Sequence, residues 1–208
     1  MRFTRQLIAA LALLCASVVH AEVVAGVDYK LLNPPQPTSG GKNIEVLEFF
    51  FYGCSHCFHL HPLISEWEKH KPKDVSLQYV PVVFNENWEP MAHTFYALEA
   101  MGDLKKLHDP LFEAWNVQNI DLSDEAKITD FVAKYGVDPK RFGADYNSFT
   151  VSSKIARSNQ LVQNYGVRGT PTVAVDGKYI ITGLQPAETI RVLDEVIKIA
   201  RKERSKRK

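Results

Sequence analysis

The chain has 208 residues, of which 45% are hydrophobic and 24% are charged, with a formal net charge of +1. This composition suffices for one compact domain, or for one domain carrying an insertion, and it argues against an intrinsically disordered chain. No strong imbalance of charge points to an acidic or a basic partner.

The first 21 residues have the features of a secretory signal peptide. Arg2 and Arg5 precede an apolar run over residues 7–14, and a stretch of small residues ends at Ala21. The apolar run is short for a transmembrane helix, so we expect cleavage after Ala21 and export. Cleavage would remove Cys15; a lipid-anchoring role for this cysteine is the alternative, but Leu13 and Leu14 are unlike the small residues expected before such a site.

The next segment is expected to hold a short strand and then an irregular loop. Val27, Tyr29 and Leu31 alternate as they would in a strand. Three prolines and two glycines follow within residues 34–41, which marks a loop. Residues 44–51 are then almost continuously apolar, which predicts a central strand covered on both faces.

Two cysteines at helical spacing follow this strand. Cys54 and Cys57 lie two residues apart, and the pattern predicts a helix from Cys54 to about Lys71, kinked at Pro62. A sulfur at the start of a helix faces unpaired backbone N–H groups, which favours the thiolate. We therefore predict that Cys54 is the low-pKa nucleophile and that Cys57, one turn further on, is the buried resolving thiol.

Histidines surround the pair and leave other interpretations open. His56 lies between the cysteines, where its imidazole could stabilise the Cys54 anion, whereas His59 and His61 are expected to be surface or groove-lining residues. A zinc site would use the same residue types, but no second cysteine pair is present and one short helix cannot readily close a tetrahedron. A permanent disulfide is the other alternative, although an exported scaffold would normally need several bridges.

The remaining chain alternates between strand and helix patterns. Residues 75–84 predict a second strand, and residues 88–164 predict helices without an intervening strand. Residues 172–175 and 178–182 flank Asp176 and Gly177, which is a strong hairpin signal. A final helix is expected from Pro186, and its end at residues 198–208 carries seven basic residues and one acidic residue. Cations suit a helix C-terminus, and no aromatic residues interleave the run, so we do not expect nucleic-acid binding.

Three stretches together resemble the DsbA family of periplasmic thiol:disulfide oxidoreductases. They are the sequence LEFF at residues 47–50, the cysteine motif, and VRGTPTVAVDGKY at residues 167–179. Their order and spacing span nearly all of the chain after the signal peptide. The resemblance implies an α/β thioredoxin-like fold with an inserted helical domain. The expected parts are residues 22–87, the insert at 88–164, and residues 165–208.

The resemblance also implies a function and partners. We expect a periplasmic disulfide oxidase that introduces disulfide bonds into newly secreted proteins by exchange through Cys54 and Cys57, without a cofactor or metal. A quinone-linked inner-membrane oxidase of the DsbB type would reoxidise it, and a monomer is expected. Each pKa unit removed from Cys54 stabilises the thiolate by about 1.4 kcal/mol, or roughly 30 mV, and makes the disulfide a stronger oxidant.

Three further residues are candidates for the site. Glu48 lies inside the apolar strand, where a buried carboxyl would have a raised pKa and could exchange a proton with Cys57; a solvated, edge-facing Glu48 is the alternative. The family often places a lysine near this acid, and Gln78 is expected at that position here. The resemblance further implies that Pro171 is cis and packs against the cysteines, while the backbone of Thr170 binds an extended substrate.

Two rival functions remain. A reductase or isomerase of the same fold is the nearer one, although the residues before Ile44 are too few for the dimerisation domain of the known isomerase form. A metal-binding module without catalytic activity is the other, and titration of thiols and zinc would distinguish it.

Overall fold

A five-stranded mixed sheet forms the centre of the molecule. The computed structural model describes residues 22–206, so the expected signal peptide lies outside the described residues. The strands are β1 (Lys30–Leu31), β2 (Ile44–Phe50), β3 (Val75–Pro81), β4 (Thr172–Val175) and β5 (Tyr179–Thr182), in the order β1-β5-β4-β2-β3. Only β2 and β3 pair in parallel among these strands. Every residue of β2 is buried, which agrees with the predicted central strand.

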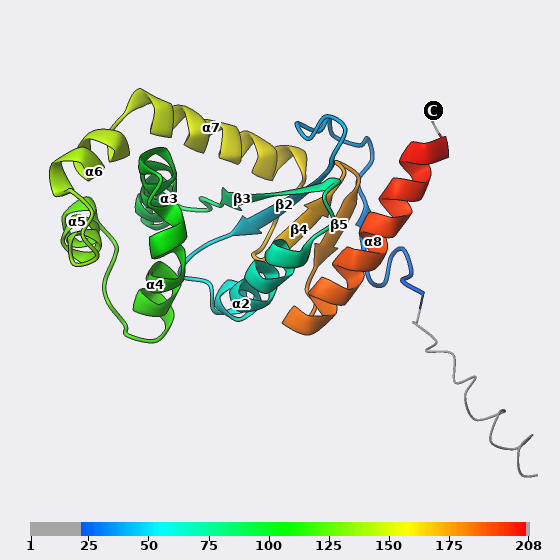
Figure 1. The fold of residues 1–208 in the computed structure, drawn as a ribbon, viewed down its shortest axis with the longest axis horizontal. Coiled ribbons are helices and arrows are strands. Elements are labelled where there is room, and N and C mark those ends of the chain that lie inside the picture. The colour runs from blue at the N-terminus through cyan, green and yellow to red at the C-terminus, as the bar shows by residue number, and fades with distance from the viewer. Residues whose placement is uncertain (1–21, 207–208) are drawn as a thin grey trace, which may run out of the picture.

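Helices cover both faces of the sheet (Figure 1). On one face, α2 (Ser55–His70) and α8 (Pro186–Lys206) pack through Leu60, Ile64 and the aliphatic stripe of α8 against alternate residues of β2, β4 and β5. On the other face, the end of α7 (Phe149–Asn164) and Tyr165 cover Leu47 and Phe49. The period-two alternation of β2 therefore sends Val46 and Glu48 toward α2, and Leu47 toward α7.

The helices predicted for residues 88–164 are confirmed. After a short 3-10 turn at Glu86–Trp88 come α3 (Glu89–Met101), α4 (Leu104–Asn116), α5 (Glu125–Ala133), α6 (Pro139–Tyr146) and α7. Their buried side chains form one core with Phe50, Tyr52 and Cys57. The cysteine helix therefore packs against the sheet and against these helices, while the division of the chain into domains stays a prediction.

One local prediction needs correction. The strand expected through Val27, Tyr29 and Leu31 is reduced to β1, because the chain turns at residues 26–28 and Val27 is 76% exposed. The helix predicted from Cys54 to about Lys71 is observed as α2, which contains Pro62, and the kink at Pro62 stays a prediction. The hairpin is confirmed: Asp176 and Gly177 have φ angles of 54° and 68°, as a type I′ turn requires.

The basic end of the chain makes specific contacts. Arg201 forms an ion pair with Asp74, and Arg204 pairs with Asp176 and donates to the carbonyls of Gly41 and Lys42. Both arginines therefore hold the end of α8 to the loops at one end of the strands. Among residues 22–206, no helix has the length and apolar character needed to cross a membrane.

Candidate functional site

The turn after β2 places Cys54 at the start of α2. The Cys54 backbone N–H donates to the Phe51 carbonyl at 3.1 Å, and Cys54 is the N-cap of the helix. Its Sγ accepts a hydrogen bond from the backbone N–H of Cys57 at 3.4 Å. The predicted position of the sulfur, facing the free N–H groups of the first turn, is therefore observed.

Gly53 permits this tight entry to the helix. A Cβ atom built on Gly53 would lie 2.5 Å from the Phe51 ring and 2.9 Å from the Trp115 ring. Any side chain at this position would push the turn away from the aromatic rings on which it packs. The glycine before the cysteine thus sets the position of Cys54.

The environment of Cys54 favours its anion. Hydrogen bonding from the Cys57 thiol, followed by Thr170 and the backbone amides of Cys57 and His56, outweighs partial burial and lowers the Cys54 pKa from 9.0 to about 5. In the protonated form, the thiol donates to the Thr170 carbonyl at 3.3 Å. Cys54 is half-buried, so its sulfur is open to an attacking thiolate.

Cys57 has the opposite character. It is fully buried on the inner side of the first turn of α2. Burial, and then the neighbouring Cys54, raise the Cys57 pKa well above its ordinary range. The pair thus combines one acidic, accessible thiol with one buried thiol that retains its proton.

Thr170 and Pro171 complete the site from the far end of the chain. The peptide bond between them is cis, as expected, and it lies immediately before β4, beside Cys54. A hollow of about 220 Å³ opens next to them, lined also by His56, Leu184 and Gln185. An extended peptide could bind beside Thr170 and Pro171 through backbone hydrogen bonds.

His56 contributes to Cys54 through its backbone amide. Its side chain is exposed and lines the hollow beside Pro171. A role of the imidazole in stabilising the thiolate stays a prediction.

Glu48 is buried and faces the cysteine helix. It is 1% exposed, so the solvated alternative for this residue is wrong. Burial, followed by the charges of Glu68 and Cys54, raises the Glu48 pKa from 4.5 to about 8. Glu48 in turn contributes to the raised pKa of Cys57, which places the two groups within electrostatic reach of each other.

The prediction that Gln78 is the neighbour of Glu48 on the next strand was wrong. Gln78 is in register with Leu47, and its exposed side chain donates to Ser39 Oγ on the opposite face of the sheet. Tyr79 is the residue in register with Glu48. Because side chains alternate along a strand, a shift of one position exchanges the two faces.

His61 is also placed differently from the prediction. Whereas His59 is exposed, His61 is buried, stacks on Phe112 of α4, and forms an ion pair with Asp109 at 2.6 Å. The signal was present in the sequence, because His61 follows Cys57 by four residues and so shares its buried helix face. His61 links the cysteine helix to α4.

Both cysteines of the described region are free thiols. Within residues 22–206, no three His, Cys, Asp or Glu side chains are arranged to hold a metal ion.

Comparison with known proteins identifies this arrangement. Residues 59–193 match the family model of the DSBA-like thioredoxin domain. The chain belongs to the DsbA family. It is therefore a thiol:disulfide oxidoreductase with the predicted thioredoxin-like α/β fold.

Individual DsbA relatives match over most of their length. The thiol:disulfide interchange protein DsbA of Burkholderia cepacia is 37% identical over 189 residues, which is 88% of each chain. The crystal structure of Pseudomonas aeruginosa DsbA superposes with a TM-score of 0.84 at 34% identity, covering 88% of this chain and 97% of that one. The oxidoreductase NmDsbA1 of Neisseria meningitidis gives 0.80 at 29% identity, covering 89% and 97%.

Proposed function

We propose that this DsbA-family chain acts as an oxidase, passing its Cys54–Cys57 disulfide to reduced proteins outside the cytoplasm. The observation that supports this direction is the lowered pKa of Cys54, to about 5, because a stable thiolate favours the reduced form of the enzyme. The predicted signal peptide and the DsbA relatives support action in the periplasm on newly secreted proteins.

The site residues have separate roles in this proposal. A substrate thiolate attacks Cys54 Sγ, the Cys54–Cys57 bond breaks, and a mixed disulfide forms while Cys57 leaves. A second substrate thiolate then attacks the substrate sulfur of the mixed disulfide and releases Cys54 as a thiolate. Glu48 supplies the proton for Cys57, and His56 stabilises the Cys54 anion. The backbone at Thr170 and Pro171 holds the substrate backbone.

Reoxidation needs an electron acceptor. A quinone-linked membrane oxidase of the DsbB type is proposed for this role, since it would return the disulfide to Cys54 and Cys57. The enzyme is proposed to act as a monomer.

The direction of exchange can be tested by equilibrating the purified protein with glutathione redox buffers at neutral pH and trapping thiols at each ratio. We expect a reduction potential above the glutathione poise of about −220 to −260 mV. A potential near that of thioredoxin, about −270 mV, would instead indicate the reductase. As a control, Cys54→Ser is expected to abolish oxidation of a reduced substrate protein.

A further inference from the structure

The proton of the buried Glu48 carboxyl has no direct route to water. Its carboxyl lies in the central strand, and its Oε2 has no hydrogen-bond partner among residues 22–206. A buried polar atom without a partner is uncommon and is often functional. Any proton that Glu48 gives to Cys57 must be replaced from water. On the side that faces the cysteines, Glu48 is bordered by the buried Cys57 thiol, which gives no contact with water.

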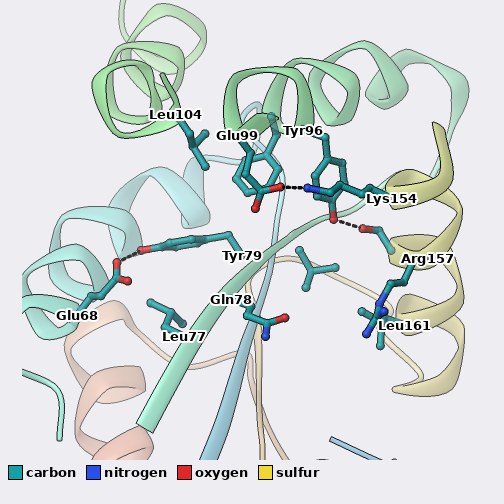
Figure 2. A pocket seen from close by; sticks show the side chains of 13 residues that line it. Glu68, Leu77, Gln78, Tyr79, Tyr96, Glu99, Leu104, Lys154, Arg157 and Leu161 are labelled. Atoms are coloured by element: carbon teal, nitrogen blue, oxygen red, sulfur yellow. Dashed lines mark hydrogen bonds and ion pairs between the residues drawn. The ribbon is translucent and has the colours of Figure 1, made fainter. Parts of the chain in front are cut away.

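A groove lies beside β3, the strand that pairs with the Glu48 strand. Tyr79 is in register with Glu48 on β3, so both side chains leave the sheet on the same face. The Tyr79 hydroxyl donates to Glu68 Oε2 at 3.1 Å, and Glu68 comes from α2, the helix that carries the cysteines. Figure 2 shows this hydrogen bond at the side of a groove of about 410 Å³, which Tyr79 and Glu68 both line.

The charges around Glu48 come from few elements. Helix α2 contributes Cys54, Cys57 and Glu68, and β3 contributes Tyr79, on whose ring His108 of α4 packs at 5.0 Å. On β4 the residue in register is Val173, and α8 presents aliphatic side chains to this core. His108 is buried, and burial lowers its pKa well below 6.5, so it is neutral at pH 7.

Glu68 is therefore the negative charge that acts on Glu48 from the groove side. After burial, the charge of Glu68 is the largest cause of the raised Glu48 pKa. The Tyr79 hydroxyl holds this carboxylate in place, and the Tyr79 pKa is itself raised by burial, then Glu48, then Glu68.

We propose that Tyr79 and Glu68 are positioning residues for the Glu48 proton: the Tyr79 hydroxyl fixes the Glu68 carboxylate on the groove side of the sheet, and the negative charge of Glu68 opposes loss of that proton. The inference rests on the proposed function. When a substrate thiolate bonds to Cys54 and the Cys54–Cys57 bond breaks, Cys57 leaves with the electron pair and takes the Glu48 proton. The Glu48 carboxylate then regains a proton from water, and reoxidation reverses each transfer.

The test follows the pH dependence of one chemical step. The oxidised protein reacts with reduced glutathione in a stopped-flow instrument across neutral pH, and each rate is divided by the concentration of glutathione thiolate. We expect this corrected rate to fall as Glu48 ionises. Glu68→Gln should move that fall to lower pH by about one unit, since removal of a like charge makes ionisation easier. Tyr79→Phe should move it in the same direction by a smaller amount.

Two comparisons make the result specific. Glu99→Gln serves as the matched control, because Glu99 lines the same groove but pairs with Lys154, and its profile should coincide with that of the unmodified protein. In a Glu48→Gln background, Glu68→Gln should cause no further shift. The carboxylic-acid infrared band of Glu48 should titrate at lower pH in Glu68→Gln, which gives a readout independent of turnover.

The outcomes separate this inference from the proposed function. An unchanged profile and infrared titration in Glu68→Gln would overturn the inference, as would an equal shift in the Glu48→Gln background. Failure of the unmodified disulfide to react with glutathione at any pH would instead overturn the proposed function.

Discussion

Cys54 and Glu48 lie close together but respond to pH in opposite directions. The Cys54 pKa is lowered from 9.0 to about 5. Between these two pH values the folded protein has therefore lost a proton that the unfolded chain still binds. The Glu48 pKa is raised from 4.5 to about 8, so the folded protein keeps a proton that the unfolded chain has lost. Between pH 5 and pH 8 a rise in pH therefore strengthens the first contribution to stability and weakens the second.

Comparing the two redox states cancels the burial of Glu48 and leaves Cys54, together with its charge acting on Glu48, as the difference. Only the reduced protein has the Cys54 thiol, whereas Glu48 is buried by the fold in either state. We predict that the free energy of unfolding of the reduced protein, minus that of the oxidised protein, rises by up to about 1 kcal/mol per pH unit from pH 5 to pH 7, less than the full linkage slope because solvent screens half-buried Cys54. Urea titrations of both states would measure it. A difference that is constant or falls with pH would contradict the lowered Cys54 pKa. Cys54→Ser cannot form the disulfide, and its free energy of unfolding should lack the rise with pH that Cys54 gives the reduced protein.

At the scale of elements, α2 is held between the sheet and α4. His61 stacks on Phe112 with ring centroids 4.6 Å apart, and its Nε2 lies 2.6 Å from Asp109 Oδ1. The His61 side chain is 7% exposed and that of Asp109 is 75% exposed. The contact thus joins a buried ring to a solvated carboxylate. We therefore expect packing of the His61 ring to supply most of the stabilisation and the carboxylate to supply little.

Two substitutions can separate packing from charge in this contact. We predict that His61→Ala lowers the free energy of unfolding by about 2–4 kcal/mol, because it leaves a cavity beside Phe112. Asp109→Asn should cost less than about 1 kcal/mol, because the Asp109 carboxylate is mostly exposed to solvent. Urea unfolding of both variants in the same redox state would measure these values, and equal costs would contradict the assignment.

At the scale of the whole molecule, one core crosses from the sheet into the helices that interrupt it. Phe50 and Tyr52 of the β2 end are buried in the same cluster as Phe95 and Phe112 of the helices. Although residues 88–164 enter the fold as an insertion, their packing continues that of the strand and the cysteine helix. The two parts should therefore lose their structure together.

We predict a single cooperative unfolding transition in urea. Tryptophan fluorescence follows Trp88 and Trp115 near the helices and Trp67 on α2, whereas far-ultraviolet circular dichroism follows all helices. The two curves should coincide for the reduced protein. Separate midpoints would show that the helices unfold independently of the sheet.

The sequence predicts most of this architecture, because strong local signals mark its elements. The apolar run of β2, the Asp176–Gly177 turn and the helical pattern of residues 88–164 each carry such a signal. Failures occurred where the answer depends on which face a side chain occupies: Gln78 lies one residue away from the face of Glu48, and His61 is buried by a helix from a distant segment. Neither relation is visible until strand register and helix packing are known.

The hydrogen bond between Cys54 and Thr170 joins residues 116 positions apart. During synthesis the cysteine pair leaves the ribosome first, and at about 5–20 residues per second the strand that covers it follows roughly ten seconds later. Until then Cys54 lacks both its Thr170 contact and the neighbouring backbone that would hold a substrate. The hydrogen bonds from Cys57 and the first helical turn that lower the Cys54 pKa are local, whereas the substrate-holding residues arrive only near the end of synthesis, so an incomplete chain has its thiols but lacks the segment that would hold a substrate.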